Sequence, residues 1–278
     1  MKKIDSHLHF WRYDPKEYTW ISEQMPQLRQ DRLPEHLRKE LEQHGFHGCV
    51  AIQAHQTEEE TEFLLELSRQ HSFVKAVVGW VDLQDEDLEQ RLSHYCRLKV
   101  LKGFRHIVQD EPDDEFLLRA DVIRGVELLK DFGFTYDILV YEKHLPVVVR
   151  FLEQLPDQPF VLDHIGKPVM EGGPSKAWKE NIQLIAQHPN VFCKLSGLVT
   201  EADWDNWTTE DFLPFLEVVW KAFGPERLMI GSDWPVCLLA AKDYGEVIHV
   251  VDAFMEGCTL EEKEAVYGEN AIRFYHIT

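Results

Sequence analysis

Short runs of apolar and β-branched residues recur along the chain, and segments with apolar positions every three or four residues separate them. Such runs predict strands, and they lie at residues 3–7, 49–54, 76–82, 101–106, 135–140, 160–164, 191–195 and 228–232. The spaced segments predict helices at residues 58–70, 85–97, 114–132, 143–155, 176–188, 211–223 and 244–255. They also predict a last helix from Thr259 to Phe274. This alternation is typical of βαβ units and a parallel sheet.

Eight βα units fit either a closed (β/α)8 barrel or an open doubly wound sheet. The open sheet normally binds a nucleotide through a glycine-rich turn after its first strand, whereas this chain has His-Leu-His-Phe-Trp there. We therefore predict a distorted (β/α)8 TIM barrel. Its 278 residues suit one barrel, and no linker or repeat interrupts them, so we predict one domain over residues 1–278. Residues 10–33 form an aromatic-rich loop that is unusually long for a βα connection.

Composition narrows the functional classes. The formal net charge of −20 repels nucleic acid and anionic lipid, so we expect neither as a partner. No long apolar segment predicts a membrane span or a leader, which favours a soluble, cytoplasmic protein. The five cysteines lack Cys-x-x-Cys spacing, which argues against a disulfide framework and a zinc-thiolate site. The sequence leaves the oligomeric state open.

The carboxyl ends of the predicted strands carry many polar residues, and active sites of barrels lie at those ends. They include His7, His9, Gln53, His55, Asp82, Arg105, His106, Asp137, Asp163, His164, Lys194, Ser196, Ser232 and Asp233. A structural strand end often has one serine or aspartate as a helix cap, whereas four of these eight ends supply histidine. The pattern therefore indicates a site in the barrel mouth.

Three histidines and one aspartate are the main candidates. His7 and His9 are two residues apart on one strand, so both side chains point to the same side. Neutral imidazole is the commonest metal ligand, although His-x-His alone is also compatible with packed or solvated histidines. Asp233, at the end of the last strand, is a candidate metal ligand or general base, with a turn cap as the alternative. His164 is the third histidine that we expect in the mouth.

Five segments together resemble the amidohydrolase superfamily. They are D-S-H-L-H-F-W at the start, G-F-R-H-I-V-Q at 103–109, D-H-I-G-K-P at 163–168, K-L-S-G at 194–197 and G-S-D-W-P-V at 231–236. The chain resembles in particular the amidohydrolase 2 branch, which includes hydrolases of L-fuconolactone and L-rhamnonolactone and 2-pyrone-4,6-dicarboxylate lactonase. The resemblance spans the whole chain and implies a distorted barrel that hydrolyses the ester of a small lactone.

The resemblance also implies a metal site. The superfamily's ligand pattern corresponds to His7, His9, His164 and Asp233. Many members place a histidine after strand five, where this chain has Asp137, so the second metal of a binuclear site lacks its usual ligand. We therefore expect at most one divalent ion, with zinc as the first choice. Catalysis without a metal stays open, with the histidines then donating hydrogen bonds.

For a lactone, we predict that Asp233 activates the water and that His164 acts beside it as donor or ligand. We expect Arg105 to bind substrate hydroxyls or a carboxylate, and a structural salt bridge is the alternative. Further polar contacts are predicted for Gln109, Gln53 and Lys194. Stacking on a sugar ring is predicted for Trp11 and Trp234, for which packing in the core or rim is equally compatible.

Two other functions fit the same barrel. The first is a metal-dependent decarboxylase of an aromatic or unsaturated acid. The second is a non-catalytic protein that binds sugar acids. The R-H-x-x-Q segment and the Phe-Trp after His-Leu-His favour the lactonase, since they resemble the sugar-lactonase group.

Overall fold

The computed structural model describes residues 2–278. Eight parallel strands form one sheet in the order β1 to β8, so each strand pairs with its neighbour in sequence. The strands are β1 (Lys3–Leu8), β2 (Phe46–Ile52), β3 (Val74–Gly79), β4 (Leu101–Ile107), β5 (Thr135–Leu139), β6 (Phe160–Leu162), β7 (Val191–Leu195) and β8 (Leu228–Ile230).

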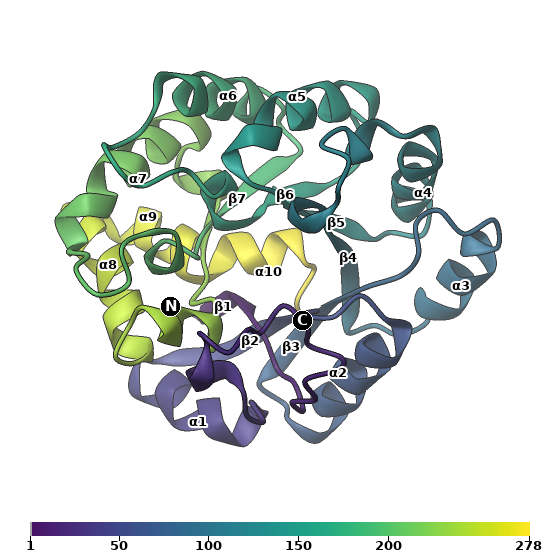
Figure 1. The fold of residues 1–278 in the computed structure, drawn as a ribbon, viewed down its shortest axis with the longest axis horizontal. Helices are drawn as coiled ribbons and strands as arrows, with labels where there is room; N and C mark the ends of the chain where they lie inside the picture. The colour runs from purple at the N-terminus through teal and green to yellow at the C-terminus, as the bar shows by residue number, and fades with distance from the viewer. Residues whose placement is uncertain (1) are drawn as a thin grey trace.

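Helices surround the strands as an outer ring (Figure 1). The α-helices are α1 (Pro34–Gln43), α2 (Glu58–Gln70), α3 (Leu88–Tyr95), α4 (Ala120–Asp131), α5 (Leu145–Gln154), α6 (Lys176–Ala186), α7 (Thr209–Phe223), α8 (Tyr244–Phe254), α9 (Leu260–Glu264) and α10 (Asn270–Phe274). The predicted (β/α)8 barrel is confirmed. None of the helices in residues 2–278 is long and apolar enough to cross a membrane.

The first and last strands meet just beyond their ends and close the barrel. The amide of Asp233 donates to the carbonyl of His7 at 2.8 Å, and the amide of His9 donates to the carbonyl of Trp234 at 2.7 Å. Below this contact, buried Asp5 accepts hydrogen bonds from the amides of His7 and Ser232. The closure therefore fixes His9 and Asp233 side by side.

Apolar side chains fill three regions of the barrel. The largest cluster lies between strands and helices, and a second cluster fills the barrel interior, where Ile4, Val161 and Met229 pack against Phe274 and Tyr275. The C-terminal residues thus close one end of the barrel, and α10 crosses that region in yellow in Figure 1. The third cluster, which we call the mouth cluster, consists of Trp11, Tyr18, Ile21, Leu28 and Ala54 with partly buried Tyr13, Trp20, Met25, Val236 and Leu239.

Most elements differ from the predicted bounds by a few residues, as β2, which begins at Phe46, and α4, which begins at Ala120, show. The helix Pro34–Gln43 was not predicted, because Leu37 and Leu41 are its only buried residues besides Pro34. Strand β6 ends at Leu162, since the next residues form a tight turn with left-handed backbone. The last predicted helix is divided into α9, a π-helical turn and α10.

Candidate active site

Left-handed backbone places two of the candidate side chains in the barrel mouth. His164, just after β6, has φ of 54°, and Asp233, just after β8, has φ of 57°. Residues with a Cβ rarely adopt this conformation, and it persists only where the surrounding structure holds it. Both side chains are buried. At both strand ends, left-handed backbone therefore turns a polar side chain into the barrel mouth.

Two glycines make room for the side chains of His7 and His164. A Cβ on Gly231 would lie 2.6 Å from Cβ of His7. A Cβ on Gly197, which has φ of 64°, would lie 2.4 Å from Nδ1 of His164. That nitrogen is 2.9 Å from the hydroxyl of Ser196, so the turn after β7 fixes the imidazole of His164 on one side. Burial lowers the pKa of His164 well below its usual value, which keeps the ring neutral.

Asp233 forms a hydrogen bond with His9. Nδ1 of His9 donates to the carbonyl of Ile52 at 2.9 Å, because a carbonyl only accepts. Nε2 of the same ring is 3.2 Å from Oδ1 of Asp233, and this contact orients the carboxylate. Burial would raise the pKa of Asp233, but His164 and the hydrogen bond with His9 hold it below its usual value. Asp233 is therefore a carboxylate at neutral pH.

Below this pair, two buried cations face two buried carboxylates around His7. Lys194 contacts Asp137 at 2.5 Å and Asp163 at 3.0 Å, and Arg105 contacts Asp163 at 3.0 Å. The four side chains are between 0% and 3% exposed, so each charge depends on its partners. Burial would raise the pKa of Asp163, but Lys194 and His7 hold it well below its usual value.

His7 connects this charged cluster to Asp233. Its Nδ1 is 3.3 Å from Asp163, and its Nε2 is 3.2 Å from Nη1 of Arg105 and 3.8 Å from Asp233. Burial lowers the pKa of His7 well below its usual value, so the ring is neutral. Arg105 and Lys194 only donate, so Nε2 faces one donor and Nδ1 faces another, since Nζ of Lys194 is 3.2 Å from Nδ1.

A pocket of about 500 Å³, open to solvent, lies above these side chains. Five of the predicted site residues line it: His9, Arg105, Gln109, His164 and Asp233. They follow or end the strands β1, β4, β6 and β8. The structure therefore brings predicted residues from separate strand ends to one cavity.

The other predicted residues lie outside the pocket lining. Lys194 is fully buried with its two carboxylates, and Trp11 is fully buried in the mouth cluster. Trp234 is 3% exposed and packs against Phe10. Gln53 is fully buried and accepts hydrogen bonds from Arg105, so it holds the guanidinium in place.

Trp20 and Lys167 are among the pocket residues that were missed in the sequence. Trp20 lies in the aromatic loop at 10–33, and Lys167 lies in the D-H-I-G-K-P segment. The signal for Lys167 was its place three residues after His164, and φ of 44° brings it back to the mouth. Trp20 had no signal that separated it from the other aromatic residues of its loop.

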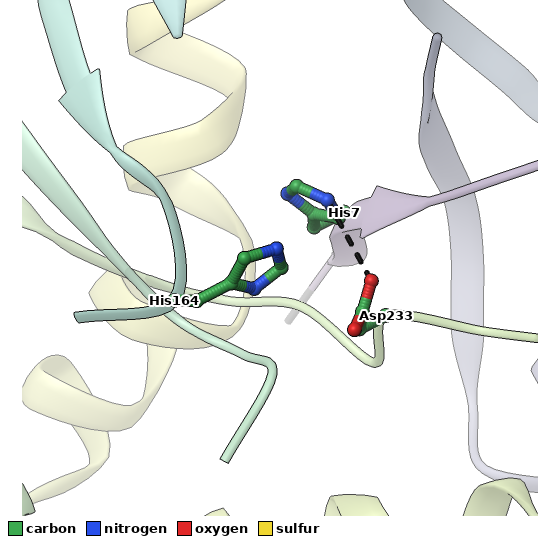
Figure 2. Close-up of side chains that lie close together, drawn as sticks. All are labelled: His7, His164 and Asp233. Carbon is green, nitrogen blue, oxygen red and sulfur yellow. Dashed lines mark ion pairs between the residues drawn. The ribbon is translucent and has the colours of Figure 1, made fainter. Parts of the chain in front are cut away.

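The donor set fits one divalent ion. His7, His164 and Asp233 each offer one ligand atom, and these atoms lie within 4.8 Å of one another. Figure 2 shows the two imidazoles and the carboxylate around a common space. Two nitrogens and one oxygen form a set that zinc accepts, with one position left for a further ligand. His9 is outside this group, since Ile52 and Asp233 occupy its nitrogens.

The amidohydrolase family model matches residues 4–277. An L-fucono-1,5-lactonase of Burkholderia multivorans is 41% identical over 98% of this chain and 95% of its own length. A second L-fucono-1,5-lactonase, from Burkholderia ambifaria, is 34% identical over 99% of this chain and 96% of its own length. The chain therefore belongs to the amidohydrolase family.

A solved structure supports the metal fit. The crystal structure of an amidohydrolase from Burkholderia multivorans with bound zinc superposes with a TM-score of 0.96 at 40% identity, and the match covers both chains completely. The zinc is a property of that protein. In this chain, Nε2 of His7 already accepts from Arg105, so an ion bound at that nitrogen competes with the guanidinium.

Proposed function

We propose that this protein hydrolyses the ester of a small sugar lactone to the open-chain sugar acid. The observation that carries the proposal is a buried Asp233 carboxylate between His9 and His164, at a pocket whose lining also holds Arg105 and Lys167. The lactonases that match this chain over nearly its whole length support the same reaction. They also disfavour the decarboxylase alternative.

Asp233 is the general base of the proposed reaction. Its carboxylate takes a proton from water as the oxygen attacks the lactone carbonyl carbon. The tetrahedral oxyanion that forms needs donors nearby. We assign the tautomer of His164 in which Nδ1 accepts from the hydroxyl of Ser196 and Nε2–H is one of these donors. As the ring C–O bond breaks, the proton on Asp233 passes to the leaving alkoxide.

A divalent ion held by His7, His164 and Asp233 would take the place of the Nε2–H donor and supply positive charge beside the lactone carbonyl oxygen. The charged cluster of Lys194, Arg105, Asp137 and Asp163 holds His7 in place. Burial, Lys194 and Arg105 keep the ring of His7 neutral, and its contacts with Asp163 and Arg105 fix the direction of its Nε2. Arg105 also reaches the pocket, where it can bind a substrate hydroxyl or the product carboxylate.

A pH-indicator screen of aldonolactones and aromatic lactones tests the proposal, with metal analysis of the same sample. We expect acid release from an aldonolactone and no release of CO2 from aromatic acids. Asp233→Asn removes the proton acceptor at nearly constant shape, so it should lower kcat/KM by at least about 10²-fold with an unchanged circular dichroism spectrum. Wild-type activity in Asp233→Asn would exclude Asp233 as the base.

A further inference from the structure

The long loop at 10–33 contributes one wall of the pocket through Trp20. Among the pocket-lining residues, Trp20, Ala54 and Val236 belong to the mouth cluster. The indole Nε1–H of Trp20 donates to the carbonyl of Ala54 at 2.9 Å. Because this hydrogen bond uses the only polar group of the ring, the wall presents no donor or acceptor of the indole to a ligand.

A buried carboxylate ties this loop to the barrel. Glu60, in the first turn of α2, is 5% exposed and does not line the active-site pocket. Its Oε2 accepts from the amides of Ala54 at 2.9 Å and His55 at 2.7 Å. Its Oε1 accepts from the hydroxyl of Tyr18 at 3.0 Å. One side chain thus holds both the turn that carries Ala54 and the loop that carries Trp20.

The polar residues of the same pocket, including His9, Arg105, His164 and Asp233, come from other strand ends. A lactone whose carbonyl lies beside Asp233 therefore meets polar groups at its reacting end and an apolar surface at Trp20. A methyl substituent packs against such a surface. A hydroxymethyl group there finds no hydrogen-bond partner on the indole, which weakens binding.

We propose that Trp20 is a specificity-determining residue, which selects lactones whose terminal exocyclic carbon is a methyl group, and that Tyr18 and Glu60 are its positioning residues. The inference rests on the proposed lactonase function. It adds the class of substrate, since the side of the pocket at Trp20 binds the methyl group of a deoxy-sugar lactone.

The test compares two lactones of the same ring size, L-fuconolactone and L-galactonolactone, which differ only in the hydroxyl on carbon 6. We expect the wild-type protein to favour L-fuconolactone about 10-fold or more in kcat/KM, as expected for a group of this size in an apolar pocket. Trp20→Ala should bring the ratio close to one. The matched control is Trp204→Ala, since Trp204 is an exposed indole that donates to Thr200 outside the pocket, and it should keep the wild-type ratio.

The positioning role is tested at Tyr18 and Glu60. Tyr18→Phe removes only the hydroxyl and should lower the ratio mainly through a higher KM for L-fuconolactone, with kcat nearly unchanged. Glu60→Ala should lower it as well, whereas Glu60→Gln keeps the acceptor for the two amides and should restore the ratio. Trp20→Phe, which keeps an aromatic ring, gives an intermediate ratio if Trp20→Ala fails to fold.

The outcomes are distinct. A wild-type ratio near one, or a wild-type ratio retained by Trp20→Ala, overturns the inference about Trp20. Equal effects of Glu60→Gln and Glu60→Ala overturn the positioning role. Hydrolysis of neither lactone by the wild-type protein would instead refute the proposed function.

Discussion

A methyl group added at Gly197 tests whether the position of the His164 side chain controls the reaction, apart from any loss of fold stability. In Gly197→Ala, the new Cβ would lie 2.4 Å from Nδ1 of His164, whereas ordinary contacts begin at 3.4 Å. The imidazole must therefore move by about 1 Å, which disturbs the hydrogen bond between its Nδ1 and the hydroxyl of Ser196. A displacement of that size at a reacting group costs about 10²-fold in rate.

The same substitution strains the backbone, because φ at Gly197 is 64°. Alanine in this conformation costs roughly 1–2 kcal/mol. Gly172→Ala is the matched control: its φ is 80°, but no atom lies within 4 Å of the added Cβ. Both variants should lose melting temperature, by about 2–4 °C per kcal/mol for a protein of this size.

The assay is kcat/KM for the preferred lactone, measured with thermal unfolding of the same samples. We expect Gly172→Ala to keep wild-type kcat/KM and Gly197→Ala to lose about 10²-fold, with a further loss of melting temperature from the overlap. Wild-type kcat/KM in Gly197→Ala would refute the reasoning, since it would mean that the position of His164 does not control the reaction.

Three further predictions concern charge and metal. Lys194→Met leaves Asp137 and Asp163 without their shared cation, so the free energy of unfolding should fall by about 3–5 kcal/mol in denaturant titrations, and an unchanged midpoint would contradict the buried pairing. Burial raises the pKa of Glu60 from 4.5 to about 7, so the folded state holds the proton more strongly than the unfolded state. The contribution of Glu60 to the free energy of unfolding therefore falls as pH rises from about 4.5 to 7. Glu60→Gln should therefore flatten the pH dependence of unfolding by up to roughly 3 kcal/mol between about pH 5 and 8, and equal slopes in both proteins would exclude this effect. Added zinc should raise the melting temperature of the wild-type protein but not of His164→Asn, and equal shifts would place the ion elsewhere.

The repeat of strands and helices could be read from the sequence because each element carries its own periodicity. The helix Glu58–Gln70 and the strand Val191–Leu195 have the predicted bounds, since a helix cap or a strongly apolar run marks them locally. The resemblance to amidohydrolases was also local, in five short segments, and the family match over residues 4–277 confirms it. The sugar-lactone prediction agrees with the relatives that match the chain.

The sequence by itself therefore determined the class of fold, the family and the residues that gather at the strand ends. Only the tertiary structure decided which of them reach the pocket, because burial and pairing depend on side chains far apart in the chain. Lys194 and Trp11 look like site residues in sequence, yet one neutralises two carboxylates and the other packs inside the mouth cluster. Trp20 reaches the pocket because its loop is held to α2 by Tyr18 and Glu60, a contact across 42 residues that no local pattern predicts.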